Sequence, residues 1–355
     1  MEPQENPELL GQEGAERALL DGAGSGRLAH AWLLTGPRGV GKATLAFRFA
    51  RHLLAGKGEG GGLFGDEPAT LAMAPSDPVF RRVASGAHPD LRRIARGINP
   101  KTGKLRSEIV IDDIREAVAF LRLTPSEGGW RVVVVDGAED MNRNAANALL
   151  KVLEEPPPQA VLLLVCHAPG RLLPTIRSRC RKLDVKSLPM AIVLELLARH
   201  EPAMSEADRR MVAGLAEGSI GRALALAEAG GVDLYRELSG LLLPLPKLNA
   251  AALHKLADKV ARGSADGTFR IAAELLTAWL VRLQKLAAGS AGAESELIAD
   301  EAASMRRLAG TGPASRWIDF TETMQRHFAL VEGLNLDRRQ VWIATMLGLQ
   351  RMAMG

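Results

Sequence analysis

A glycine-rich turn constrains the fold of this chain more than any other feature. It consists of Gly36, Pro37, Arg38, Gly39, Val40, Gly41 and Lys42. The turn follows the short apolar run 31–35, and it precedes residues 45–54, whose apolar side chains have helical spacing. Glycines there let backbone N–H groups point inward, and the start of the helix adds partial positive charge. With the final lysine, this pattern is typical of a P-loop, which binds phosphates, rather than of an ordinary glycine-rich turn.

The residues that normally bind Mg²⁺ and activate water beside a P-loop are altered. Ala43 follows the lysine where a Ser or Thr hydroxyl is expected. Thr44 comes one position late, and one helical step turns it about 100° away. Asp136 ends the strand-like run 131–135, as the metal-binding carboxylate of such sites does, but Gly137 stands where a water-activating acid is expected. Glu139 lies further along and need not reach the site. We therefore predict that the loop keeps the backbone geometry that binds phosphate, and that its Mg²⁺ site is impaired.

Apolar strands and helices alternate through the first 186 residues. Strands are predicted at 31–35, 131–135, 161–165 and 181–185, with a helix at 144–153 that Asn142 caps. Strands that are apolar throughout indicate a parallel sheet buried on both faces. After Pro189 we predict helices alone, beginning with 191–200, 206–216 and 221–228. The predicted fold class is α/β plus all-α, with domains at 1–186, 187–232 and 233–355.

Composition excludes several classes of protein. The two cysteines, Cys166 and Cys180, are too few for a disulfide framework or a cysteine-rich zinc module. No apolar stretch approaches the roughly 20 residues of a membrane span. The acidic N-terminal residues lack the basic and apolar regions of a signal peptide. We therefore expect a soluble cytoplasmic protein with no membrane partner.

A basic segment at 81–106 interrupts the α/β region. It contains eight lysines and arginines but a single acid, Asp90, so its net charge of +7 exceeds the +4 of the whole chain. Residues 99–103 are rich in turn formers, which predicts a hairpin there. Either this segment is a solvated basic surface, or it binds an anionic partner such as the DNA backbone.

Several motifs together resemble the clamp-loader branch of the AAA+ ATPases. These are Gly36–Lys42, His88-Pro89-Asp90, Asn142–Pro157, Ser178-Arg179-Cys180, Gly218–Arg222 and Leu334–Arg338. The most specific is the run from Asn147 to Pro157. The resemblance implies a RecA-like AAA+ P-loop domain, a small helical lid and a helical collar domain. Members of this family assemble into five-subunit rings that load a sliding clamp onto primed DNA during replication by DNA polymerase III.

The resemblance implies a role for single residues. Arg179 would act in trans as an arginine finger on ATP bound to a neighbouring subunit. The altered residues Ala43 and Gly137 resemble those of the stator, a ring subunit that does not hydrolyse ATP. The candidate nucleotide-binding residues are Gly36, Gly39, Gly41, Lys42, Thr44, Asp136 and Arg222, the last matching the family's second sensor arginine. ATP or ADP is expected to bind weakly or not at all.

The resemblance also implies partners, and it shows one departure from the family, which concerns zinc. The partners would be gamma or tau and delta subunits, and, through the complex, the sliding clamp and primer-template DNA. The isolated chain would catalyse nothing, although it would belong to a polymerase holoenzyme. The family often carries a four-cysteine zinc module after the P-loop helix, but residues 51–82 contain no cysteine. We therefore expect no zinc.

Two alternatives remain open at this stage. The chain could be an active ATPase subunit that uses Thr44 and Glu139 in place of the missing groups. It could also be a DNA-binding module that acts through the basic segment 81–106. Trp317 and Trp342 are either anchors of a collar interface or internal core residues.

Overall fold

The computed structural model describes residues 2–24, 28–56, 70–99, 102–262, 267–289, 296–334 and 336–355. Parts of the predicted hairpin at 99–103 and of the motif at 334–338 lie outside these residues. The chain divides into two compact units, Met1–Ile192 and Val193–Gly355, each of which is described by itself. The finer division into three domains stays a prediction.

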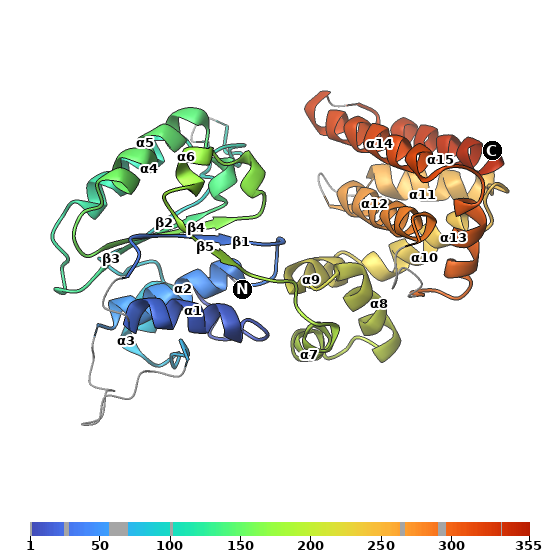
Figure 1. Cartoon of the computed structure of the whole chain (residues 1–355). Coiled ribbons are helices and arrows are strands. Elements are labelled where there is room, and N and C mark those ends of the chain that lie inside the picture. The colour runs from blue at the N-terminus through green and yellow to red at the C-terminus, as the bar shows by residue number, and fades with distance from the viewer. Residues whose placement is uncertain are drawn as a thin grey trace. The chain divides into compact units, whose positions relative to one another are not determined.

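A five-stranded parallel sheet with the order β2-β3-β4-β1-β5 forms the centre of the first unit. The strands are β1 (Ala31–Thr35), β2 (Leu91–Ile94), β3 (Arg131–Asp136), β4 (Ala160–Cys166) and β5 (Arg181–Asp184). The helices are α1 (Glu13–Gly24), α2 (Lys42–Leu54), α3 (Pro78–Ala84), α4 (Ile111–Leu121), α5 (Arg143–Glu154) and α6 (Pro174–Arg177), with 3-10 turns η1 (Ala138–Asp140) and η2 (Pro169–Arg171). Figure 1 shows α1–α3 on one face of the sheet and α4–α6 on the other.

The alternation of side chains along the strands builds a separate core on each face. Leu34 and Leu163 pack in the core beside α1 and α2, whereas Leu33 and Leu164 pack in the core beside α4 and α5. Both faces are covered by helices, so the strands can be apolar throughout. The predicted parallel sheet is confirmed.

The helix after β3 begins as the sequence indicates. The side chain of Asn142 accepts a hydrogen bond from the backbone N–H of Ala145 at 2.9 Å, which caps α5. Strand β2 was not predicted, because Arg92 and Arg93 interrupt its two apolar residues. It lies at the edge of the sheet and pairs with β3 alone, which leaves room for exposed charged side chains.

The second unit is helical in the part of the chain that the structure describes. Its helices are α7 (Met190–His200), which spans the division between the units, α8 (Glu206–Ala216), α9 (Ile220–Glu228), α10 (Gly231–Leu242), α11 (Ala250–Arg262), α12 (Thr268–Ala287), α13 (Glu301–Ala309), α14 (Ala314–Leu334) and α15 (Arg338–Met354). Helix α12 packs against α10, α11, α13 and α14. Trp317 and Trp342 are 1% and 0% exposed, so both are core residues of this unit.

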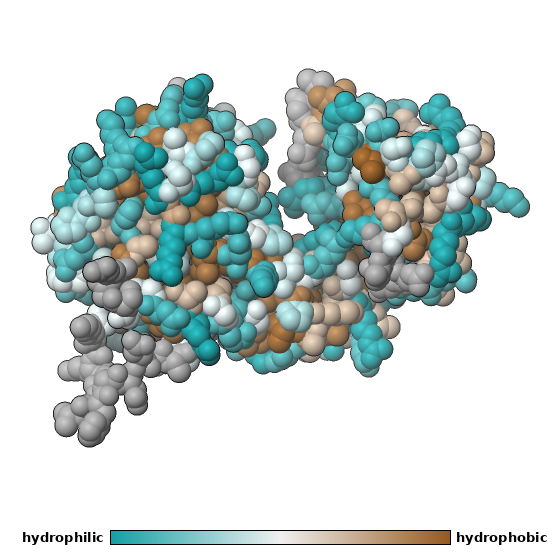
Figure 2. Space-filling model, in the orientation of Figure 1, coloured by the Kyte–Doolittle hydropathy of each residue, from teal (hydrophilic) through white to brown (hydrophobic). Residues whose placement is uncertain are grey.

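Large hydrophobic side chains also remain at the surface of both units. Ile98, Leu105 and Leu123 are exposed in the first unit, and Leu347 and Met354 in the second. On the face shown in Figure 2, hydrophobic residues lie between hydrophilic ones.

A buried polar cluster joins three helices of the second unit. Glu301 of α13 is fully buried and forms an ion pair with Arg282 of α12 at 2.9 Å. Tyr235 of α10 donates a hydrogen bond to the same carboxylate, and burial raises the pKa of Tyr235, so its hydroxyl stays protonated. The cluster links the packing of α10, α12 and α13.

We expect Glu301→Gln to destabilise the second unit by about 3 kcal/mol, because Arg282 would keep its charge without a buried counter-ion. Tyr235→Phe removes one hydrogen bond and keeps the ion pair, so it should cost about 1 kcal/mol. Urea unfolding, followed by the fluorescence of the buried tryptophans, measures both. Equal effects of the two substitutions would contradict this account of the cluster.

Candidate functional site

The P-loop lies between β1 and α2, at the edge of the sheet where the strands have their carboxyl ends. Gly36 has a φ of 143°, and a Cβ there would lie 2.0 Å from the backbone oxygen of Val185. Gly41 has a φ of 99° and precedes the first turn of α2. A side chain at either position would strain the turn, which explains why both are glycines. The strand–loop–helix geometry predicted for Gly36–Lys42 is therefore present.

The side chain of Lys42 is held by its own loop. Its Nζ donates hydrogen bonds to the backbone oxygens of Gly36, at 2.7 Å, and Pro37. The residue is 3% exposed. Burial lowers the pKa of Lys42 to about 8, although the carboxylates of Glu139 and Asp136 act in the opposite direction. The lysine expected to bind phosphate is thus already partnered within the cradle.

Glu139, the acid that the active-ATPase alternative requires at the site, acts electrostatically on the P-loop lysine. It lies in η1 and is 9% exposed, and among the carboxylates it raises the pKa of Lys42 most strongly. One of its oxygens accepts a hydrogen bond from the backbone N–H of His167 at 2.9 Å. Burial and Glu139 together raise the pKa of the Cys166 thiol to about 12. Burial and Lys42 lower the pKa of His167.

Asp136 ends β3 as predicted, but its carboxylate is paired with an arginine. Oδ2 of Asp136 lies 3.2 Å from Nη2 of Arg93, which projects from β2. Nη1 of Arg93 also lies 2.8 Å from a carboxylate oxygen of Glu2. Ala43 adds no oxygen ligand, and Thr44 is buried in the first turn of α2. The groups at this edge therefore already balance one another's charges.

Arg179 lies at the surface of the first unit, just after α6. Its Nη1 donates to the backbone oxygen of Thr175 at 3.1 Å, and its Nη2 lies 2.9 Å from Oε1 of Glu154. The side chain remains 37% exposed. Exposed ion pairs of this kind stabilise weakly, so the guanidinium can exchange Glu154 for another anion.

Arg222 belongs to the second unit, whereas the P-loop belongs to the first. Its backbone N–H donates to the hydroxyl of Ser219 at 3.1 Å, which caps α9. Its guanidinium lies 3.7 Å from the carboxylate of Glu217. A role of Arg222 in nucleotide binding stays a prediction.

Most arginines of the basic segment 81–106 have partners elsewhere in the first unit. Arg82 pairs with Glu127, Arg93 with Asp136, Arg96 with Asp140, and Arg106 with Asp113. Arg92 lies over the ring of Phe120, 5.2 Å from its centroid. The predicted turn is present as a single antiparallel bridge between Ile98 and Leu105, with Pro100 and Lys101 outside the described residues. The fold therefore neutralises much of the +7 charge.

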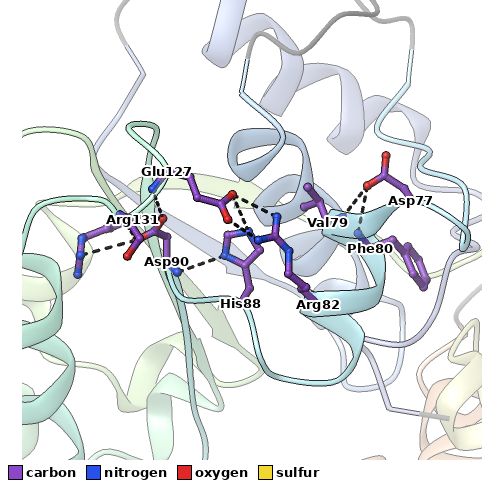
Figure 3. Close-up of polar contacts among 9 residues, drawn as sticks. Asp77, Val79, Phe80, Arg82, His88, Asp90, Glu127 and Arg131 are labelled. Carbon is purple, nitrogen blue, oxygen red and sulfur yellow. Dashed lines mark hydrogen bonds and ion pairs between the residues drawn. The ribbon is translucent and has the colours of Figure 1, made fainter.

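The His88-Pro89-Asp90 motif anchors the loop that precedes β3 (Figure 3). The buried carboxylate of Asp90 accepts hydrogen bonds from the backbone N–H groups of Ser126, at 2.8 Å, and Glu127, at 3.2 Å. Arg131 lies 3.7 Å from the same carboxylate, and Glu127 lies between Arg82 and His88. Burial lowers the pKa of His88. These contacts give the motif a structural role.

A groove of about 700 Å³ runs between α4 and α5 on the other face of the sheet. The groove is lined by three cationic side chains, those of Arg115, Arg122 and Lys151. Its apolar lining includes Val118 and Ala148. Sequence reasoning missed this site because its cations lie on two helices far apart in the chain.

The residues that the structure describes contain no group of three or more His, Cys, Asp or Glu side chains that could bind a metal ion. None of the helices among these residues has both the length and the apolar composition that crossing a membrane requires.

The family model described as "DNA polymerase III, delta subunit" matches residues 11–189. DNA polymerase III subunit delta' of Pseudomonas aeruginosa is 40% identical over 179 residues, which are 50% of each chain. The tau subunit of Escherichia coli is 30% identical over 234 residues, 64% of this chain and 33% of that protein. The chain thus spans half or less of the length of these curated relatives.

Solved structures also resemble the chain. A gamma subunit-related protein of DNA polymerase III from Thermotoga maritima is 20% identical, with a TM-score of 0.44, over 97% of this chain and 99% of that one. The RuvB Holliday junction branch migration motor of the same organism is 17% identical, with a TM-score of 0.40, over 80% of each chain.

We expect Lys42 to titrate near pH 8 in the folded chain, because burial disfavours its charged form. Its folded pKa lies below the ordinary 10.5, so the unfolded state binds more protons between about pH 8 and 10.5, and stability rises with pH across that window. Reductive ¹³C-methylation and NMR measure the titration, and Lys42→Arg should remove that resonance. Titration of every lysine above pH 9.5 would contradict the prediction.

Proposed function

Since the chain belongs to the DNA polymerase III delta subunit family, whose model matches half of its length, we propose that it is a delta prime subunit of a clamp loader. In this proposal it is a non-hydrolysing stator that supplies Arg179 to the ATPase site of a neighbouring subunit. Its partners are gamma or tau and delta subunits and, through the complex, the sliding clamp and primer-template DNA. We also propose that the protein acts in the cytoplasm.

The observation that carries the proposal is the contrast between Arg179 and the chain's own P-loop. Lys42 is buried and bonded to its own loop, and Asp136 is paired with Arg93. Arg179 is exposed, and its polar partners, Glu154 and the backbone of Thr175, leave it accessible at the surface. The groups suited to turnover in cis are thus engaged internally, while a cation suited to act in trans is accessible.

The second unit supports an assembly role. Its buried helical core leaves Ile318, Leu330, Leu347 and Met354 between 42% and 64% exposed. Exposed apolar side chains on α14 and α15 are suited to packing against helices of neighbouring subunits. We propose that these helices form the collar of the ring.

We expect Arg179→Ala to leave the chain folded and to reduce ATP turnover of the assembled ring. The neighbouring site should lose about a thousandfold in rate, because no other cation replaces the guanidinium that stabilises γ-phosphate charge. Steady-state ATPase assays with clamp and primed DNA measure this loss. Arg177→Ala, at an exposed arginine at the end of α6 and two residues before Arg179, is the matched control. Unchanged ring turnover with Arg179→Ala would refute the proposal.

An active ATPase is the second candidate, and the electrostatic effect of Glu139 on Lys42 favours it. Steady-state assays of the isolated chain with Mg²⁺ and ATP separate the two candidates. The stator proposal requires no turnover above background. Turnover that Lys42→Ala abolishes would establish the ATPase.

We propose that contact with DNA, within the ring, involves the groove between α4 and α5 rather than the paired arginines of 81–106. Arg122→Ala combined with Lys151→Ala should reduce the salt dependence of DNA binding by the ring, by about one unit of the log–log slope for each phosphate that the ring no longer neutralises. Arg82→Ala combined with Arg96→Ala is the control, because both arginines are already ion-paired. A larger effect of the control pair would favour the basic segment.

A further inference from the structure

The two groups that normally hold Mg²⁺ beside a P-loop are altered in this chain. Mg²⁺ at a P-loop is held by a hydroxyl next to the lysine and a carboxylate at the end of another strand of the sheet. Here Ala43 has no hydroxyl, and the carboxylate of Asp136 is occupied by the guanidinium of Arg93 at 3.2 Å. The two positions that normally bind the metal therefore do not fit it.

The position of Arg93 is fixed by contacts on several sides. Its guanidinium lies between the carboxylates of Asp136 and Glu2, and 6.0 Å from the centroid of the Phe47 ring. The register of β2 against β3 pairs Arg93 with Val134 and Ile94 with Val135, so Arg93 projects just before Asp136 ends the neighbouring strand. Arg93 is thus held close to Asp136 by the sheet itself.

We infer that Arg93 is a built-in cation that takes the place of the divalent metal at Asp136 and makes this P-loop independent of Mg²⁺. This inference rests on the proposed function, in which the site does not hydrolyse nucleotide. A guanidinium between two carboxylates neutralises Asp136 in this structure, and a metal would have to displace it. The loss of the hydroxyl at Ala43 and the presence of Arg93 are therefore two separate barriers to Mg²⁺.

Because each of these two features alone opposes Mg²⁺ binding, we expect substitutions at Ala43 and Arg93 to have non-additive effects on the Mg²⁺ dependence of nucleotide binding. Ala43→Thr restores the hydroxyl but leaves Asp136 paired, so it should not make nucleotide binding depend on Mg²⁺. Ala43→Thr combined with Arg93→Ala removes both barriers, and binding of a fluorescent ATP analogue should then be at least about tenfold tighter with Mg²⁺ than with EDTA. Arg93→Gln should act in the same way and guards against a folding defect of Arg93→Ala.

The neighbouring arginine provides a matched control. Arg92 lies on the same strand but stacks on Phe120, so Ala43→Thr combined with Arg92→Ala should behave like Ala43→Thr alone. Fluorescence titrations of the full chain, with circular dichroism to check folding, give the affinities. The inference is overturned if the wild-type chain or Ala43→Thr alone already prefers Mg²⁺. It is also overturned if neither double variant at Arg93 gains the preference. None of these outcomes affects the test of Arg179 in the assembled ring, so the two proposals can fail separately.

Discussion

The parallel register of β1, β3 and β4 determines where the charged groups of the P-loop edge lie. Thr35 is paired with Cys166, and Asp136 with Val165, so the loops after these strands begin at the same edge of the sheet. Parallel strands bring the ends of segments far apart in the chain to one place. Lys42, Asp136 and Glu139 meet there for this reason, and removal of any one strand from the register would separate them.

The same edge balances its charges without a ligand. The ammonium group of Lys42 is bonded to carbonyl oxygens of its own loop, and Arg93 neutralises Asp136. Buried or half-buried charges are costly unless they are paired, so these contacts stabilise the edge in the absence of nucleotide. A motor subunit needs the opposite arrangement, in which lysine and carboxylate remain available for phosphate and metal. The internal pairing of Lys42 and Asp136 therefore favours the proposed role, in which the chain keeps the P-loop fold but does not turn over ATP.

The fold could be predicted from the sequence wherever a local pattern determined it. The apolar run of β3, the cap at Asn142 and the glycines of the P-loop each act within a few residues, and the structure confirms them. Strand β2 was not predicted, because its two arginines interrupt the apolar pattern by which a strand is recognised in the sequence. The contact of Arg93 with Asp136 and the groove between α4 and α5 also escaped prediction. Both features depend on strand register and on packing between segments that are far apart in the sequence. The spacing of residues along the chain does not reveal either of these.

Arg93 and Arg179 illustrate how context assigns different roles to the same side chain. Arg93 is held between two carboxylates and beside an aromatic ring, so releasing it would uncover Asp136 and Glu2 together. Arg179 is held by one surface carboxylate and one backbone oxygen, an arrangement that stabilises by on the order of 1 kcal/mol or less. The phosphate groups of ATP offer a guanidinium several charged oxygens in a site with little water, which is a stronger interaction than an exposed ion pair. In the proposed ring, Arg179 would therefore exchange its partners for ATP bound to a neighbouring subunit, whereas Arg93 is expected to remain in place.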